Sequence, residues 1–456
     1  MSGLFGTDGI RGEAGVRPLD PDTIHRVGRS LARNLASGLS GLPGKTPRIL
    51  IGRDTRSSGS AIESWLAGGI AAGGGEAFSA GVMSTPGVAY LTQRLGFSAG
   101  IAISASHNPF PDNGVKIFSG EGSKAGEELE RAISKEALQE TPENPNGKDR
   151  AITLPPPDPS LQEEYIGYLK STTTPAATAA LGSFKLAADF ANGATYQIGP
   201  RLLREIGVEV LSSGVSPDGR NINENCGSTH PEVLARIVTE SGCDFGAALD
   251  GDGDRLLLVD RHGQLVNGDA ILLMCARHMK REDRLPGAGI VATVMSNLAL
   301  ERALTVEGIA LHRTQVGDRH VAEEMEGRGI ALGGEQSGHI IFSEYAPTGD
   351  GLLTLLQVLR VLVSEKKPLH ELAHLKPFPQ ILVNVPVKEK RDVREVPEIV
   401  HAMEEAERQI AGRGRLLVRF SGTEPLLRIM LEGPDEGEIR ALSASIAEAT
   451  RRNLAE

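Results

Sequence analysis

The stretch GIAISASHNPFPDNGVKI, from Gly100 to Ile117, carries the strongest structural signal in the chain. Its first four residues form a short apolar run that predicts a buried strand. A polar loop with two prolines and several turn formers follows, and a second apolar segment then predicts another strand. The pattern presents Ser106, His107 and Lys116 around one loop. Because reactive groups of open α/β sheets gather at the strand ends, we expect this loop to carry function, with Ser106 exposed on it.

The rest of the chain divides into four successive units. Strand and helix patterns alternate in the first three, which is typical of α/β domains, whereas the last has an α+β pattern. The segment 141–160 is rich in proline, asparagine and charge and predicts a linker after the first unit. We therefore predict domains over residues 1–150, 160–258, 259–372 and 376–456.

Composition narrows the class of protein. The chain has 456 residues, a net charge of −11 and only 4% aromatic residues, which argues against general nucleic-acid binding. Three cysteines without a C-x-x-C spacing make a disulfide framework or a zinc site improbable and fit a reducing compartment. No apolar stretch reaches the roughly 18 residues of a membrane-spanning helix. We expect a cytoplasmic protein with neither nucleic-acid nor membrane partners.

A second candidate site lies in the string ALDGDGDR, residues 248–255. Three carboxylates, Asp250, Asp252 and Asp254, stand at alternate positions after a predicted strand, and the glycines between them let the loop curl so that the oxygens converge. Hard divalent cations prefer such oxygen ligands. A Ca²⁺ loop of the EF-hand type is excluded, because its glycine and glutamate positions are occupied by Arg255 and Arg261. The pattern predicts a Mg²⁺ site.

Two further strings contribute polar groups. GGEQSGH, residues 333–339, follows a predicted strand, and its Glu335 and Ser337 offer the hydrogen-bonding groups that a sugar ring needs. FGTDGIRG, residues 5–12, places Arg11 in a glycine-rich leader. Such a segment is ordinarily flexible, but an arginine near a phosphorylated serine would serve function.

The fifth string, RFSGTEP at residues 419–425, lies between two predicted strands. Arg419 offers a fixed fork of donors for phosphate. Ser421, Thr423 and the backbone around Gly422 add neutral donors. We expect this string to form a phosphate-binding cradle, with a simple hairpin turn as the alternative.

The five strings occur in one order along the whole chain, and together they resemble the α-D-phosphohexomutase family. Within it they are most similar to the group that acts on glucosamine phosphates, of which Gln336 is typical. The resemblance implies an α/β fold: three related α/β domains with mixed sheets and a smaller C-terminal α+β domain, all around a central cleft. One departure concerns the third domain, where the sequence 316–319 is Val-Gly-Asp-Arg. The Thr-Gly-His string of other members is missing there, so no catalytic histidine is carried over, and Arg319 or His320 stays a candidate for substrate contact.

The resemblance also implies a reaction. Ser106 is the implied phosphoryl carrier, because the family pattern places the reactive serine directly before His-Asn-Pro, although spacing alone leaves Ser104 as an alternative. The phosphate on Ser106 and the three aspartates would hold Mg²⁺. Glucosamine 6-phosphate and glucosamine 1-phosphate would interconvert through a bound hexosamine 1,6-bisphosphate.

Charge on the transferring group would be offset by the metal and by cationic side chains, for which the candidates are Arg11, His107, Lys116 and Arg255. Either Lys116 or His107 would handle the hydroxyl proton. The implied partner is a small phosphosugar, and the implied assembly is a homodimer. The alternatives are a phosphomannomutase/phosphoglucomutase with the same machinery and a phosphosugar-binding protein without turnover.

Overall fold

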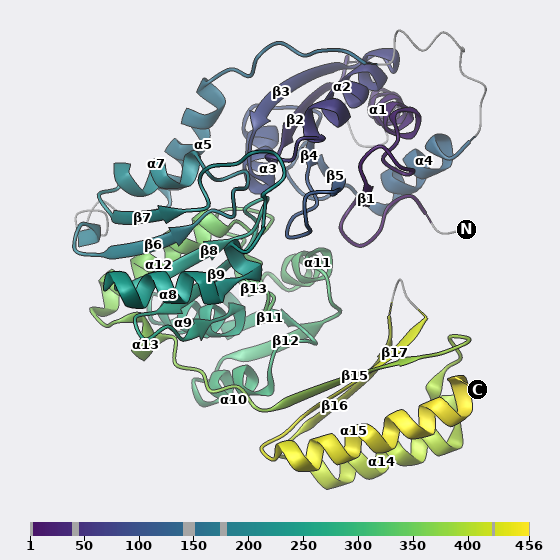
Figure 1. Cartoon of the computed structure of the whole chain (residues 1–456), viewed down its shortest axis with the longest axis vertical. Coiled ribbons are helices and arrows are strands. Elements are labelled where there is room, and N and C mark those ends of the chain that lie inside the picture. Colours follow the sequence, from purple (N-terminus) through teal and green to yellow (C-terminus); the bar gives the residue numbers. More distant parts are fainter. Residues whose placement is uncertain (1–2, 39–44, 140–150, 174–179, 422–424, 456) are drawn as a thin grey trace. The chain divides into compact units, whose positions relative to one another are not determined.

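The computed structural model of the chain describes residues 3–38, 45–139, 151–173, 180–421 and 425–455 (Figure 1). It contains two compact units. The larger unit, residues 1–295 and 309–374, holds three sheets, and the smaller unit, residues 296–308 and 375–456, holds a fourth. Mixed α/β sheets followed by a small α+β unit confirm the predicted fold class. Half of the predicted linker, residues 141–150, lies outside the described residues.

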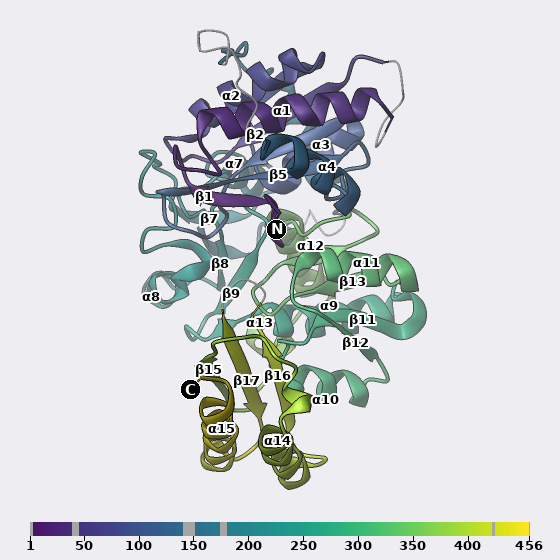
Figure 2. The ribbon, with the colours of Figure 1, turned by 90° about the vertical axis from the view of Figure 1, so that its right-hand side faces the viewer.

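The first sheet has five strands in the order β1-β5-β4-β2-β3. Strands β2, β3 and β4 are parallel, whereas β5 runs antiparallel to β4 and β1 antiparallel to β5. Strand β4 is buried throughout, as its apolar run predicted. Figure 2 shows α1 and α2 next to each other over this sheet. The elements are β1 (Ile10–Glu13), α1 (Pro21–Ala36), β2 (Arg48–Arg53), α2 (Gly59–Ala72), β3 (Glu76–Val82), α3 (Thr85–Arg94), β4 (Ala99–Ile103), β5 (Asp112–Ser119) and α4 (Glu127–Ala137).

Strand β1 was not expected from the sequence. The glycine-rich leader pairs with β5 over four residues, with Ile10 opposite Val115 and Arg11 opposite Gly114. Ile10 is fully buried in the core of the first sheet, and this burial holds the leader segment, residues 5–12, against the sheet. The pairing places Arg11 beside the strand that carries Lys116.

The second sheet repeats this arrangement in the order β10-β9-β8-β6-β7. Strands β6, β7 and β8 are parallel and β9 turns back antiparallel to β8. The fully buried strand β8 leads directly into the aspartate string. The elements are α5 (Ser160–Ser171), β6 (Lys185–Asp189), α7 (Ile198–Glu205), β7 (Glu209–Ser213), η1 (Gly227–Thr229), α8 (Pro231–Ser241), β8 (Phe245–Leu249), β9 (Leu256–Asp260) and β10 (Leu265–Val266).

The third sheet has four strands in the order β12-β11-β13-β14, again with three parallel strands and a final antiparallel one. Helix α12 is almost wholly buried, and the Asp350 side chain caps its first turn by accepting from Leu353 N. The elements are α9 (Gly268–Arg281), η2 (Pro286–Ala288), β11 (Gly289–Thr293), α10 (Leu298–Val306), β12 (Ala310–Thr314), α11 (Asp318–Arg328), β13 (Leu332–Gly334), β14 (Ile340–Phe342), α12 (Gly351–Glu365) and α13 (Leu369–Leu372).

The fourth sheet is a fully antiparallel ladder in the order β15-β17-β16, and α14 and α15 cover one of its faces (Figure 1). Helix α15 and the alternate residues of the strands that face it form a separate apolar core. The elements are β15 (Gln380–Pro386), η3 (Val393–Glu395), α14 (Pro397–Ile410), β16 (Arg415–Phe420), β17 (Leu426–Glu432), α15 (Glu436–Thr450) and η4 (Arg451–Ala455).

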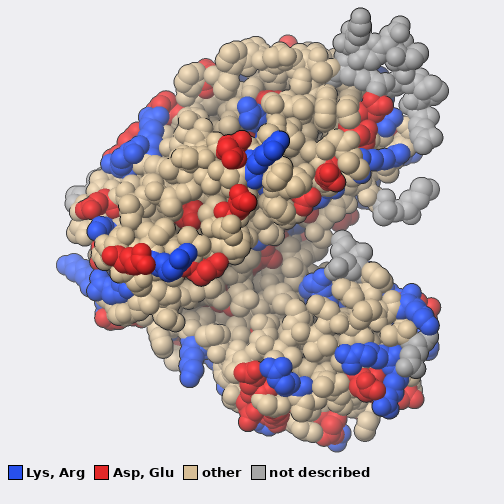
Figure 3. Space-filling model, viewed as in Figure 1, with Lys and Arg blue, Asp and Glu red and all other residues tan. Residues whose placement is uncertain are grey.

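Acidic and basic side chains are interspersed on the molecular face shown in Figure 3. Over the described part of the chain, no helix combines the length and the apolar character that crossing a bilayer requires.

Candidate active site

Ser106 lies in the loop after β4, and its side chain faces the second sheet. Its hydroxyl Oγ donates to Asp250 Oδ2 over 2.5 Å and lies 3.3 Å from His107 Nδ1. The expectation that Ser106 would be exposed is wrong, because only 1% of its surface is accessible. The loop between β8 and β9 covers it: a Cβ on Gly251 would come within 2.6 Å of the Ser106 carbonyl oxygen.

Ser104, the alternative carrier, has a different environment. Its buried hydroxyl donates to Asp54 Oδ2 over 2.6 Å and accepts from the backbone N–H of Ser106 over 2.9 Å. Both contacts hold the loop together, and neither involves Asp250, Asp252 or Asp254. The geometry therefore favours Ser106 over Ser104 as the reactive group.

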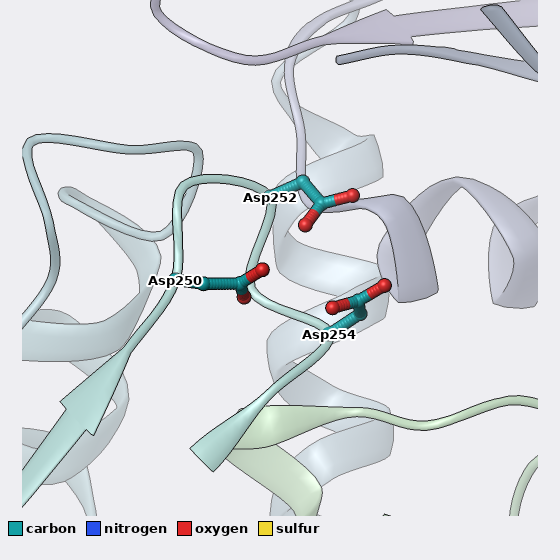
Figure 4. Close-up of side chains that lie close together, drawn as sticks. All are labelled: Asp250, Asp252 and Asp254. Carbon is teal, nitrogen blue, oxygen red and sulfur yellow. The ribbon is translucent and has the colours of Figure 1, made fainter. Parts of the chain in front are cut away.

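The three aspartates converge as the string predicted. Asp250, Asp252 and Asp254 are buried, and each offers an oxygen within 4.8 Å of the others (Figure 4). Gly253 allows the curl because it adopts a φ of 75°, in the left-handed region. Burial, together with the neighbouring charges of Asp254 and Asp252, raises the pKa of Asp250 well above its usual value.

Two carboxylate oxygens of this cluster, Asp252 Oδ1 and Asp254 Oδ1, are buried and have no hydrogen-bond partner among the described residues. Unpartnered buried acceptors are costly unless something else satisfies them. A hard divalent cation such as Mg²⁺ would satisfy both, and a set of oxygen ligands suits it. The residues present therefore fit the predicted ion.

Lys116 on β5 is enclosed by carboxylates. Its Nζ lies 2.9 Å from Asp252 Oδ2, 3.3 Å from Asp254 Oδ2 and 3.2 Å from Asp8 Oδ2. Burial by itself lowers the pKa of Lys116, but the negative charges of these three carboxylates raise the pKa well above its usual value. Lys116 is thus a fixed positive charge next to Ser106 and the aspartates.

Of the remaining candidates, Arg11 and Arg255 each keep one donor without a hydrogen-bond partner among the described residues. Arg11 binds Asp8, yet its Nη1 is buried with no hydrogen-bond partner among the described residues. Arg255 Nε likewise lacks a hydrogen-bond partner there, although it lies 3.9 Å from Asp254 Oδ1. His107 is exposed by area, but desolvation of its ring, with Arg255 close by, lowers the pKa of His107 to about 4. Donors without partners in a buried site are what an anionic ligand requires.

The loop between β13 and β14 carries Glu335 and Ser337. Glu335 Oε1 accepts from Gly317 N over 3.1 Å, and Ser337 Oγ is buried without a partner among the described residues. At the end of the same loop, His339 Nδ1 lies 3.6 Å from Asp254 Oδ2. The third sheet thus reaches the aspartate loop directly.

Gln336, which the resemblance singled out, points elsewhere. Its side-chain Nε2 donates to Asp269 Oδ2 over 3.2 Å, and its backbone carbonyl accepts from Gly268 N over 3.0 Å. Gln336 therefore fastens the Glu335 loop to the start of α9. Arg319, a candidate for substrate contact, donates two hydrogen bonds to Glu130.

The smaller unit contains the string that was predicted to form a phosphate cradle. Arg419 on β16 is paired in register with Arg428 on β17, so the two guanidinium groups lie on the same face of the sheet. Arg428 Nη2 donates to Ser421 Oγ over 3.3 Å. Two further residues of the predicted cradle, Gly422 and Thr423, lie outside the described residues.

Several contributors were missed from the sequence. Asp8 joins Arg11, Lys116 and Lys124 through ion pairs, and its place inside the leader string was the only available signal. Lys124 also binds Asp318 of the third sheet's unit over 2.7 Å. Such contacts join segments up to 194 residues apart, which no local pattern reveals.

Comparison with known protein families gives a consistent result. Models of the phosphoglucomutase/phosphomannomutase family match in chain order: the alpha/beta/alpha domains I, II and III over residues 2–144, 163–263 and 267–378, and the C-terminal domain over residues 382–449. The chain belongs to this family, the α-D-phosphohexomutases. It is 46% identical to the phosphoglucosamine mutase of Solibacter usitatus over 99% of each chain. The predicted family and the resemblance to its phosphoglucosamine mutase group are thereby confirmed.

Solved structures share the fold of the whole chain. A putative phosphomannomutase from Thermus thermophilus superposes with a TM-score of 0.76 at 23% identity, covering 99% of both chains. An Aspergillus fumigatus N-acetylphosphoglucosamine mutase in complex with GlcNAc-6P and magnesium superposes with a TM-score of 0.67 at 19% identity, covering 98% of this chain and 95% of that one.

Proposed function

We propose that the chain is a phosphoglucosamine mutase that interconverts glucosamine 6-phosphate and glucosamine 1-phosphate, with phosphorylated Ser106 as the phosphoryl donor. One observation supports this most: the Ser106 hydroxyl lies 2.5 Å from a buried aspartate triad in a chain that matches phosphoglucosamine mutases over its full length. A phosphosugar-binding protein without turnover would not need a buried serine next to three aspartates and several cationic side chains.

The proposed reaction has two mirrored transfers. A free hydroxyl of the bound sugar phosphate attacks the phosphorus on Ser106 and loses its proton to a base. The Oγ–P bond breaks with its electrons on Oγ, which takes up a proton. The product is a hexosamine 1,6-bisphosphate, which turns end for end and returns its other phosphoryl group to Ser106. Each cycle therefore regenerates the phosphoenzyme, with no net transfer of phosphate between the protein and the sugar.

The side chains around Ser106 have distinct tasks in this proposal. Lys116, held by three carboxylates, keeps its proton and supplies fixed positive charge to the transferring group. The open donors of Arg11 and Arg255 bind phosphate oxygens. His107, with Nδ1 3.3 Å from Ser106 Oγ, is within reach of the transferred proton.

The metal and the sugar use the remaining groups. Asp250, Asp252 and Asp254, with the phosphate on Ser106, would hold Mg²⁺, which supplies charge neutralisation for phosphoryl transfer. Glu335 and Ser337 bind sugar hydroxyls. Arg419 and its neighbours bind the phosphate that is not being transferred.

The proposal extends to the setting of the enzyme. We expect it to act in the cytoplasm, where its three buried cysteines stay as free thiols, and to assemble as a homodimer. Light scattering coupled to size-exclusion chromatography measures the assembly.

The test compares substrates and detects the phosphoenzyme. Glucosamine, glucose and mannose 6-phosphates are assayed with Mg²⁺ and a trace of glucose 1,6-bisphosphate, and intact-mass and peptide analysis locates phosphate on the protein. We expect the highest kcat/KM for glucosamine 6-phosphate and phosphate on Ser106. A higher kcat/KM for glucose or mannose 6-phosphate, or phosphate on Ser104, would contradict the proposal.

A further inference from the structure

The backbone of Ser106 is held in an unusual conformation. Its φ is 50°, in the left-handed region that residues other than glycine rarely adopt. Such a conformation persists only where the surroundings enforce it, and it occurs often at functional sites. In the present loop, the enforcing contacts converge on the carbonyl groups that follow Ser106.

Arg56, in the loop after β2, supplies most of them. Its Nη2 donates to Ser106 O over 3.1 Å and to Asn108 O over 2.7 Å. Its Nη1 donates to Pro109 O over 2.5 Å and to Asp112 O over 3.0 Å. Four backbone carbonyls of the serine loop thus converge on one guanidinium group.

The fifth donor of Arg56 orients the group itself. Nε donates to Asp54 Oδ2 over 2.9 Å, and that carboxylate also accepts from the Ser104 hydroxyl. Every N–H of the guanidinium therefore has an acceptor, and the side chain is fully buried. A buried arginine that uses four donors on the serine loop, and the fifth on Asp54, is well suited to hold that loop in a single conformation.

Asn223 acts from the other side, within the second sheet's part of the chain. Its amide Nδ2 donates to Ser106 O over 2.9 Å and to Asn108 O over 3.1 Å. These are the same two carbonyls that Arg56 Nη2 binds. The Ser106 carbonyl oxygen is thus gripped between a guanidinium of one α/β domain and an amide of the next.

We propose that Arg56 and Asn223 form a clamp on the Ser106 and Asn108 carbonyls that aims Ser106 Oγ at the aspartate triad. Both are positioning residues, since neither contacts the triad or the transferred group. The proposal rests on the assigned role of Ser106 as phosphoryl carrier. It predicts that loss of the clamp slows transfer to and from Ser106 without weakening sugar binding.

The chemistry of the clamp makes the substitutions informative. Lysine at position 56 keeps the positive charge but offers three donors around one atom, so it cannot reach four carbonyls and Asp54 together. Asn223→Ala removes one donor group and leaves the Arg56 contacts in place. A shift of about 1 Å in a reacting group can lower the rate roughly 100-fold. We expect kcat to fall about 10- to 100-fold in Arg56→Lys and by a smaller factor in Asn223→Ala.

The experiment measures kcat, KM and Tm for both variants, together with the rate at which dephosphorylated protein takes phosphate from glucose 1,6-bisphosphate. Intact-mass analysis follows the phosphorylation. We expect kcat and the phosphorylation rate to fall by the same factor while KM changes less than twofold. Arg284→Lys is the matched control: this arginine binds Glu282, Glu344 and Tyr345 away from the loop. Its substitution should lower Tm and leave kcat unchanged.

The outcomes separate the two proposals. Wild-type protein that takes no phosphate on Ser106 overturns both the assigned function and the clamp. Wild-type phosphorylation, with kcat per folded molecule in the variants within twofold of wild type, overturns the clamp alone. A rise in KM in place of a fall in kcat also overturns it, because the residues would then act on substrate binding. Should Arg56→Lys fail to fold, Asn223→Ala decides by the same criteria.

Discussion

Replacing Arg419 by alanine is the sharpest test of the proposed phosphate cradle. Arg419 stands directly opposite Arg428 on the neighbouring antiparallel strand. Burial and the charge of Arg428 lower the pKa of Arg419 below its usual value. Among the described residues, the Arg419 guanidinium has no hydrogen bond or ion pair. Two like charges side by side on a sheet face are an unfavourable arrangement unless an anion binds between them.

This geometry determines how much Arg419→Ala should change the stability of the protein and its affinity for the sugar phosphate. Like charges directly opposite in an antiparallel pair destabilise by roughly 0.2–1 kcal/mol, so Arg419→Ala should leave the free energy of unfolding unchanged or slightly higher. Loss of a charge-assisted bidentate contact with phosphate should cost about 2–3 kcal/mol of binding. That energy corresponds to roughly 30- to 150-fold weaker apparent affinity. Stability and affinity should therefore change independently.

The assay measures KM for glucosamine 6-phosphate and for glucosamine 1-phosphate, since the same cradle would hold the 6-phosphate of one isomer and the 1-phosphate of the other. We expect KM to rise by a similar factor in both directions, with Tm unchanged or slightly raised. Arg413→Ala is the control, because this exposed arginine of the same unit pairs with Glu438 on the surface. A KM increase confined to one isomer, or an equal increase in the control, would refute the shared cradle.

Three other substitutions test the remaining site. Ser106→Ala should abolish turnover and protein phosphorylation while lowering the free energy of unfolding by about 1–3 kcal/mol, because the buried Asp250 carboxylate loses a hydrogen bond, as chemical denaturation would show. Asp252→Asn should raise the Mg²⁺ concentration for half-maximal activity without changing sugar preference, because ligand charge sets affinity for hard cations; an unaltered Mg²⁺ titration would remove Asp252 from the metal shell. Gly251→Ala should lower kcat more than 10-fold, since its Cβ would lie 2.6 Å from Ser106 O and 2.8 Å from Asn223 Nδ2; wild-type kcat would show that the close approach is unimportant.

Local sequence patterns were sufficient to predict the strands and loops that carry the candidate site residues. The apolar runs before Ser104 and before Asp250 predicted strands β4 and β8, and the polar residues after each run predicted the loops that follow. Both signals are local, because a buried strand followed by turn formers needs no knowledge of the rest of the chain. The same is true of the β16–β17 hairpin.

Burial and pairing could not be predicted in this way. Ser106 was expected on an exposed loop, but the residues that cover it, Asn223 and Gly251, come more than 100 residues later. The leader was expected to be flexible, but it forms β1 through its register with β5. The conformations of both segments depend on surfaces that exist only after the sheets have formed.

The common topology of the first three sheets explains why the functional strings recur where they do. In each sheet the third parallel strand, β4, β8 or β13, is followed by a strand that turns back antiparallel to it. The connecting loop must therefore lie at the carboxyl end of a parallel strand, where reactive groups of α/β sheets gather. Those three loops carry the serine, the aspartates and the Glu-x-Ser string.

Contacts between these equivalent loops then build the site. The Ser106 hydroxyl meets Asp250 over 2.5 Å, which joins the first loop to the second, and His339 approaches Asp254 within 3.6 Å, which joins the third loop to the second. In the proposed function, three copies of one structural position thus supply three different chemical tasks: a phosphoryl carrier, a cation-binding triad and a sugar-binding edge. Since the loops occupy the same position in each sheet, their sequences could diverge in function while the strands behind them kept the same packing requirements. A substitution in a loop should therefore change activity more than stability, whereas a polar substitution in β4, β8 or β13 should do the reverse.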